Sequence, residues 1–165
     1  MPKIVENVKE RIILETRKQI KEVGYSKVTI RSIAKACGIG VGTIYNYFES
    51  KDVIIANFMV DDWILCVNEI KEKISSGSNS IKSCYLGLEE YIKHHQYLFS
   101  NSDAYKNYKT ISSKWHLMLR NQIAEILDLN DAFLSEFIAE AIITWAVQGK
   151  NYDELKPIFE RLINN

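Results

Sequence analysis

Apolar residues recur at spacings of three and four along most of the chain, which is the period of an α-helix. The clearest run is an apolar stripe from Ile55 to Ile74 that keeps one helical face throughout. No period-two alternation typical of strands stands out, and only two prolines and seven glycines interrupt the chain. The pattern predicts an all-α fold, with helices at about 5–23, 30–37, 41–48, 51–74, 81–97, 104–127, 132–148 and 155–163.

Glycines and capping residues mark the ends of the first four predicted helices. Gly24 ends the first, and Thr29 stands where an N-cap of the second is expected. The triplet at 38–40, Gly-Ile-Gly, separates the second from the short third, and Ser50 precedes the fourth. Two short helices joined by a glycine turn are typical of a helix-turn-helix.

Charge is distributed unevenly although the formal net charge is zero. Residues 1–52 hold ten Lys and Arg against six Asp and Glu, a balance of +4, so the remainder carries −4. A basic N-terminal module suits a polyanion. Chance fluctuation explains an imbalance of this size equally well.

The third helix is expected to turn Ile44 and Phe48 inward, with Thr43, Tyr45 and Asn46 outward and Tyr47 beside them. Hydroxyl, phenol and amide groups behind a glycine-rich turn suit contacts with phosphates and base edges in a major groove. The alternative is that both tyrosines pack between helices.

Residues 28–51, VTIRSIAKACGIGVGTIYNYFESK, resemble the DNA-binding domain of the TetR/AcrR-like (tetracycline-repressor) family. The match comprises T-x-x-x-I-A-x-x-x-G-I in the second helix, G-T-I-Y-x-Y-F in the third, and the Ser-Lys that opens the fourth. It covers a minor part of the chain. The resemblance implies a DNA-binding domain at 1–50 with a three-helix fold, and a helical effector-sensing and dimerisation domain at 51–165.

The resemblance also implies a role for each matched position. Arg31 would touch a base or phosphate, Tyr45 and Tyr47 phosphates, and Lys51 the DNA backbone at the start of the fourth helix. The full predicted DNA-binding set is Thr29, Arg31, Val41, Gly42, Thr43, Tyr45, Asn46, Tyr47 and Lys51. Gly40 and Val41 depart from the family's Ser and longer polar residue, which shifts readout toward Arg31, Thr43, Asn46 and DNA shape.

The family resemblance further implies a homodimeric repressor on a palindromic operator, released by a small-molecule effector. The helix at 132–148 is apolar on both sides, which is typical of a helix buried on both. One side could face a partner subunit, although burial within one subunit is the alternative. The predicted dimerisation residues are Phe133, Phe137, Ile143, Val147, Ile158, Phe159 and Leu162.

Aromatic residues with polar tips are frequent in the middle helices and could line a cavity for a small amphipathic or aromatic effector. The predicted ligand-binding residues are Trp63, Tyr91, Tyr108, Trp115 and Trp145. Ordinary core packing is the alternative for each of them, and a regulator without an effector is the alternative for the whole.

Other functional classes find little support in the sequence. The three cysteines show no zinc-site spacing, and His94 and His95 diverge on a helix, so we expect no metal and no cofactor. There is no nucleophile motif or phosphate-binding glycine loop, which argues against an enzyme. We expect no signal peptide or membrane span, hence a bacterial cytoplasmic protein. A helical adaptor that binds protein is the remaining alternative.

Overall fold

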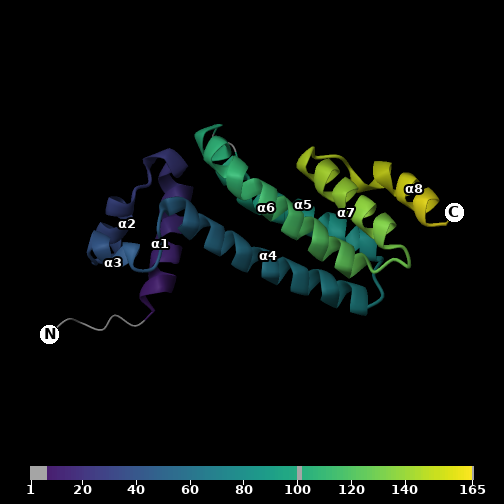
Figure 1. The fold of residues 1–165 in the computed structure, drawn as a ribbon, viewed down its shortest axis with the longest axis horizontal. Helices are drawn as coiled ribbons and strands as arrows, with labels where there is room; N and C mark the ends of the chain where they lie inside the picture. Colours follow the sequence, from purple (N-terminus) through teal and green to yellow (C-terminus); the bar gives the residue numbers. More distant parts are fainter. Residues whose placement is uncertain (1–6, 100–101, 165) are drawn as a thin grey trace. The chain divides into compact units, whose positions relative to one another are not determined.

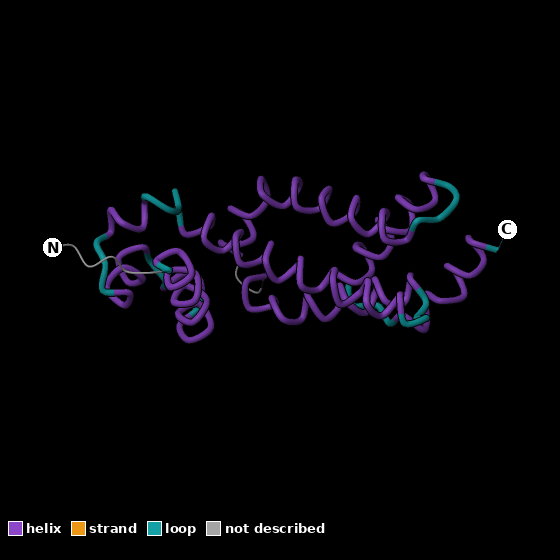
Figure 2. Tube along the Cα trace, turned by 90° about the horizontal axis from the view of Figure 1, so that it is seen from below, coloured by secondary structure: helices purple, strands orange, loops and turns teal. Residues whose placement is uncertain are grey.

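The computed structural model describes residues 7–99 and 102–164, with side chains described at 7–98 and 115–164. Its helices are α1 (Val8–Val23), the 3₁₀ turn η1 (Tyr25–Lys27), α2 (Ile30–Cys37), α3 (Val41–Tyr45), α4 (Lys51–Ser75), α5 (Ser80–Phe99), α6 (Ser102–Leu127), α7 (Ala132–Val147) and α8 (Tyr152–Ile163). Figure 1 shows their order, and Figure 2 shows helices and loops without a strand in this described part. The predicted all-α fold is confirmed.

The chain divides into two compact units. Unit 1 comprises Met1–Asp62 and Gln96–Tyr108, and unit 2 comprises Trp63–His95 and Lys109–Asn165. The division therefore falls inside α4 rather than at the predicted boundary after residue 50. The first turns of α4 belong to unit 1 because Lys51 and Asp52 both bind Tyr25, and Asp62 binds Arg17.

The core of unit 1 joins the first four helices. Ile12 and Ile20 from α1, Ile33 from α2, and Ile44 and Phe48 at α3 are all buried. Their spacing is the helical period seen in the sequence, so the inner faces of these helices are as predicted. The first helix differs at its ends, since Val5 lies outside the described residues and Val23, expected inside, is exposed.

The core of unit 2 is built around large buried side chains. Trp63 is fully buried, and its indole Nε1 donates a hydrogen bond to Gln122 in α6. Tyr85 is also buried, and its hydroxyl donates to the carbonyl of Lys150 at 2.7 Å. These bonds satisfy the polar ends of aromatic residues that contribute mainly apolar surface.

The C-terminal helices start at side-chain caps. Asp131 accepts a hydrogen bond from the N–H of Leu134 at 3.1 Å, and Asn151 accepts one from Asp153 at 3.0 Å. α8 therefore begins at Tyr152, three residues before the predicted start, and contains Pro157 within it. No helix in the described ranges is long and apolar enough to cross a membrane.

Candidate nucleic-acid interface

The segment between α2 and α3 has the geometry of a helix-turn-helix. Gly38 adopts φ 65°, a left-handed conformation that glycine tolerates, and the N–H of Ile39 donates to the carbonyl of Ala34 at 3.0 Å. The chain thus leaves α2 abruptly and enters α3 at Val41. Ile44 and Phe48, both buried, fasten α3 to the core of unit 1.

The outer side of α3 is open to solvent. Tyr45 is 54% exposed and Tyr47 is 49% exposed, and Asn46 between them is exposed as well. The two tyrosines are therefore not packed between helices, which was the alternative. Thr43 is half-buried, whereas Val41 and Gly42 are exposed at the start of the helix.

A capping box fixes the start of α2. The N–H of Ser32 donates to Thr29 Oγ1 at 3.0 Å, and the N–H of Thr29 donates to Ser32 Oγ at 3.1 Å. The Ser32 hydroxyl also donates to Gln19 Oε1 in α1 at 2.7 Å. Arg31 lies between Thr29 and Ser32, and its side chain is exposed. The helix end that carries this cation is therefore held by the capping box and by the bond to Gln19.

The side chain of Lys51, to which the family resemblance assigns a contact with the DNA backbone, binds the protein's own backbone in this structure. Its Nζ donates to the carbonyl of Tyr25 at 2.7 Å and to that of Val28 at 2.9 Å. The same nitrogen lies 3.8 Å from the centre of the Tyr25 ring. Burial lowers the pKa of Lys51, and the neighbouring Asp52 carboxylate opposes this effect.

Asp52 completes this contact from the next position of α4. The hydroxyl of Tyr25, which is buried, donates to Asp52 Oδ1 at 2.5 Å. Two consecutive residues of α4 thus hold one side chain of the turn before α2. The sequence analysis missed Tyr25 and Asp52, because nothing local to either position indicates the other.

Comparison with known proteins supports this geometry. Residues 12–57 match the family model described as "Bacterial regulatory proteins, tetR family". This stretch of the chain is therefore similar to the N-terminal part of TetR-family regulators. The match covers most of α1, all of α2 and α3 and the first turns of α4, which are the elements that carry the candidate interface.

The TetR-family likeness extends to two curated regulators over part of their length. The HTH-type transcriptional regulator YuxN of Bacillus subtilis is 32% identical over 92 residues, 53% of this chain and 32% of YuxN. The HTH-type transcriptional regulator HbdR of an Aromatoleum species is 41% identical over 54 residues, 33% of this chain and 24% of HbdR. The chain therefore spans about a third or less of the length of these relatives.

Two solved structures resemble the chain over 94% of its length and 94% of theirs, each at 18% identity. One is the fatty acid degradation regulator FadR from Bacillus halodurans, with a TM-score of 0.46. The other is a TetR-family transcriptional regulator from Haemophilus influenzae, with a TM-score of 0.44.

Outside residues 12–57, three of the predicted ligand-binding residues lie together. The ring centres of Trp63 and Tyr91 are 5.4 Å apart in an edge-to-face contact, and Tyr91 stacks with Trp115 at 6.5 Å. His95 joins them, 4.4 Å from Tyr91. Trp63 and Tyr91 are buried, as core residues are.

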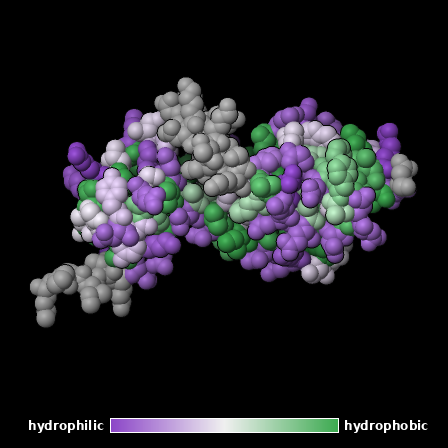
Figure 3. Space-filling model, viewed as in Figure 1, coloured by the Kyte–Doolittle hydropathy of each residue, from purple (hydrophilic) through white to green (hydrophobic). Residues whose placement is uncertain are grey.

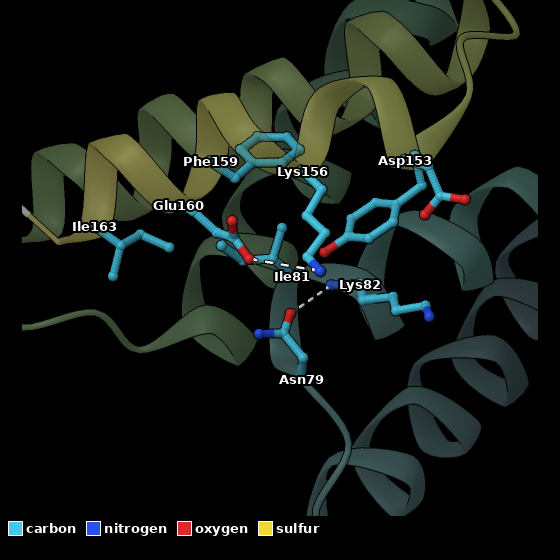
Figure 4. A pocket seen from close by; sticks show the side chains of 9 residues that line it. Asn79, Ile81, Lys82, Asp153, Lys156, Phe159, Glu160 and Ile163 are labelled. Atoms are coloured by element: carbon cyan, nitrogen blue, oxygen red, sulfur yellow. Dashed lines mark hydrogen bonds and ion pairs between the residues drawn. The ribbon is translucent and has the colours of Figure 1, made fainter.

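The other two predicted ligand-binding residues lie apart from this cluster. Trp145 contacts Phe159 at 5.7 Å between ring centres, and the side chain of Tyr108 lies outside the described residues. A groove of about 330 Å³ lies between the start of α5 and α8, and its apolar lining includes Ile81, Phe159 and Ile163. Figure 4 shows Lys156 paired with Glu160 at its rim, 3.7 Å apart. None of the five predicted residues lines this groove.

The predicted dimerisation residues divide into an exposed and a buried group. Ile143 is 3% exposed and Phe159 is 1% exposed, so these two belong to the core of a single chain, unlike the prediction. Figure 3, in the view of Figure 1, shows hydrophobic surface among hydrophilic residues in the region of α7 and α8. The other five predicted residues are exposed apolar side chains of these two helices: Phe133, Phe137, Val147, Ile158 and Leu162. We refer to these five residues as the α7/α8 face.

The described residues hold no group of three or more His, Cys, Asp or Glu side chains placed for a metal ion.

The cysteines are poor nucleophiles. Burial raises the pKa of Cys66 to about 11 and that of Cys84 to about 12, so both thiols stay protonated at neutral pH.

Proposed function

We propose that this chain is a DNA-binding transcriptional regulator that places α3 in the major groove. The observation that carries the proposal is the division of α3 into two faces. Ile44 and Phe48 hold it from within, while Tyr45, Asn46 and Tyr47 present hydrogen-bonding groups to solvent. A helix of five residues is not stable alone and depends on the packing of its buried side. The polar side chains on its exposed side therefore contribute little to the fold.

The start of α3 is built for close approach to another surface. A Cβ placed on Gly42 would meet no atom within 4 Å, and the nearest to one on Gly40 would be Thr43 Oγ1 at 3.7 Å. Neither glycine is thus required by packing within the chain, and both leave the backbone bare. Bare N–H groups at a helix start suit a phosphate.

Each exposed residue then has a proposed role. Tyr45, Tyr47 and the capping Thr29 contact phosphates, which fix register. Arg31 reads base edges with its paired N–H donors, and Asn46 does so with the donor and acceptor of its amide. Thr43 and Val41 contribute a hydroxyl and an apolar contact with a thymine methyl.

The finer proposal is a homodimeric repressor on a palindromic operator. The α7/α8 face supports association, because large apolar side chains that a single chain leaves exposed mark interaction sites. A two-fold dimer presents two copies of α3, and such symmetry is mirrored in palindromic sites. Blocking polymerase needs occupancy alone, which favours repression over activation.

Release by a small-molecule effector belongs to the same proposal. The cluster of Trp63, Tyr91 and Trp115 would bind an amphipathic or aromatic molecule only after an opening that exposes Trp63 and Tyr91, because both are buried. Such a molecule would act only by favouring a dimer geometry that fits the operator poorly.

The test is selection of duplexes from a random-sequence library, followed by titration of the best duplex at two salt concentrations. We expect a palindrome bound with strong salt dependence. Tyr45→Ala should weaken this binding by at least about tenfold, as loss of a phosphate contact and its positioning effect would.

Leu117→Ala is the matched control, because Leu117 is similarly exposed but lies on α6. It should leave DNA affinity unchanged. Recovery of no enriched sequence, with weak salt-dependent binding to every duplex or none, would favour the adaptor interpretation instead.

A further inference from the structure

The start of α4 and the turn between α1 and α2 are joined by a three-residue contact, which we call the Tyr25 clamp: Tyr25, Lys51 and Asp52. Lys51 approaches the face of the Tyr25 ring and Asp52 binds the hydroxyl at its edge. Two adjacent residues of α4 thus contact the ring face and the hydroxyl of the same tyrosine. The three side chains are buried or half-buried.

The Lys51 ammonium is committed to the protein by geometry. A lysine ammonium has three N–H donors, and two of them go to the carbonyls of Tyr25 and Val28 at 2.7 and 2.9 Å. These carbonyls belong to the first residue of η1 and to its C-cap, so the ammonium binds the turn at both of its ends. An ammonium held there would have to give up both bonds to extend toward a phosphate.

The position of the clamp explains what it can control. Val28 is fully buried and directly precedes Thr29, the N-cap of α2. Arg31 follows two residues later. Lys51 therefore fixes the backbone from which the exposed Arg31 side chain projects, and it fixes this backbone to α4.

We propose that Lys51 supports DNA binding as a positioning residue that holds the start of α2 against α4, and not as a phosphate ligand. This inference rests on the proposed function, since it assigns one residue's part in DNA binding. Loss of the clamp would lower affinity because binding would then have to order the α2 terminus.

Salt dependence separates the two roles. A lysine that neutralises a phosphate releases counterions, so its removal reduces the slope of log affinity against log salt by about 0.9. A positioning lysine changes affinity with the slope preserved. Tyr25→Phe sharpens the comparison, because it removes only the hydroxyl bonded to Asp52 and changes no charge.

The experiment measures the best selected duplex at five salt concentrations with the wild-type protein, Lys51→Met, Lys51→Arg and Tyr25→Phe. We expect all three variants to bind more weakly, Lys51→Met by about tenfold, with the wild-type slope. Lys51→Arg should not restore affinity, because the larger planar guanidinium does not fit the site between two carbonyls. Circular dichroism checks that each variant folds. If Lys51→Met does not fold, the affinity and salt slope of Tyr25→Phe test the proposal in its place.

A slope reduced by about one in Lys51→Met, with affinity restored in Lys51→Arg and unchanged in Tyr25→Phe, would overturn the positioning role and leave the proposed function intact. Failure of the wild-type protein to bind any duplex would overturn both.

Discussion

The guanidinium of Arg17 in α1 donates two hydrogen bonds to the carboxylate of Asp62 in α4, at 2.8 and 3.0 Å. The same guanidinium lies 4.6 Å from the centre of the Phe58 ring. Both charged side chains are mostly shielded from solvent, with 23% and 18% exposed. A paired fork of this kind fixes orientation as well as distance between two helices.

We expect Asp62→Ala to lower the free energy of unfolding by about 1–3 kcal/mol, because it leaves a shielded guanidinium without its carboxylate partner. Lys93→Ala, which breaks the exposed Lys93–Glu89 pair, is the control and should cost about 0.3–0.5 kcal/mol. Urea titration measures both. Equal losses in the two variants would contradict the special role of the Arg17–Asp62 pair.

Gly87 in α5 should not tolerate a methyl group. Alanine normally favours a helix over glycine by about 0.8–1.0 kcal/mol. A Cβ at Gly87, however, would lie 2.6 Å from Cγ1 and 2.7 Å from Cδ1 of Ile70, a buried side chain. Overpacking costs about 1–3 kcal/mol, so the clash should win and Gly87→Ala should unfold at lower temperature.

Gly42→Ala is the matched control for this prediction, because a Cβ at Gly42 meets nothing within 4 Å. Gly42→Ala should leave the free energy of unfolding unchanged or raise it by up to about 1 kcal/mol. A Gly87→Ala protein as stable as the wild type would show that α4 and α5 can move apart.

A charge on the α7/α8 face should prevent self-association without unfolding the chain. Phe133 is 78% exposed in one chain, so Phe133→Glu should preserve helix content while removing apolar surface from a dimer contact. Sedimentation velocity at micromolar concentration should then give a monomer where the wild type gives a dimer. Ile143→Glu, by contrast, should unfold the protein, because Ile143 is buried. A wild-type monomer would contradict the proposed dimer.

Stability should fall in alkaline solution partly because of Cys66 and Cys84. Their ordinary pKa is 9.0, and burial raises the pKa to about 11 and about 12 in the folded chain. Above pH 9 the unfolded chain loses these protons while the folded chain keeps them, so rising pH favours unfolding. Each thiol contributes a decline of up to about 1.4 kcal/mol per pH unit between pH 9 and its folded pKa.

Cys84→Ala should therefore show a shallower decline of the unfolding free energy from pH 9 to 11 than the wild type. Its stability at pH 7 provides the baseline, because both thiols are protonated there in either state. Parallel pH curves for the two proteins would contradict the prediction.

The inner faces of the helices could be predicted because each is set by local periodicity. Ile33, Ile44 and Phe48 follow from spacing alone, and all three are buried. The same reasoning placed Thr43, Tyr45 and Asn46 outward with Tyr47 beside them. Tyr45, Asn46 and Tyr47 are exposed, whereas Thr43 is half-buried. The boundaries of α2 were predicted from Thr29 and Gly38, whose capping roles depend on adjacent residues.

Contacts between distant segments could not be predicted. The resemblance assigned Lys51 to the DNA backbone, and nothing local to it indicated that its ammonium binds the carbonyls of Tyr25 and Val28, more than twenty residues away. α7 is apolar on both sides, so its sequence could not tell which side the chain itself covers. Ile143 proved to be on the covered side and Phe133 on the open one.

The short helix α3 has no side-chain cap at Gly40, and two buried residues fasten it. Its outward positions therefore contribute little to folding, and most exchanges there should alter stability by no more than about 0.5 kcal/mol. The residues that we propose for DNA recognition and those that hold the helix are thus different residues of the same five-residue helix and its C-terminal flank. Under the proposed function, substitution at the base-contacting positions 43 and 46 would change the sequence preference, in evolution or in the laboratory, while the scaffold stays the same.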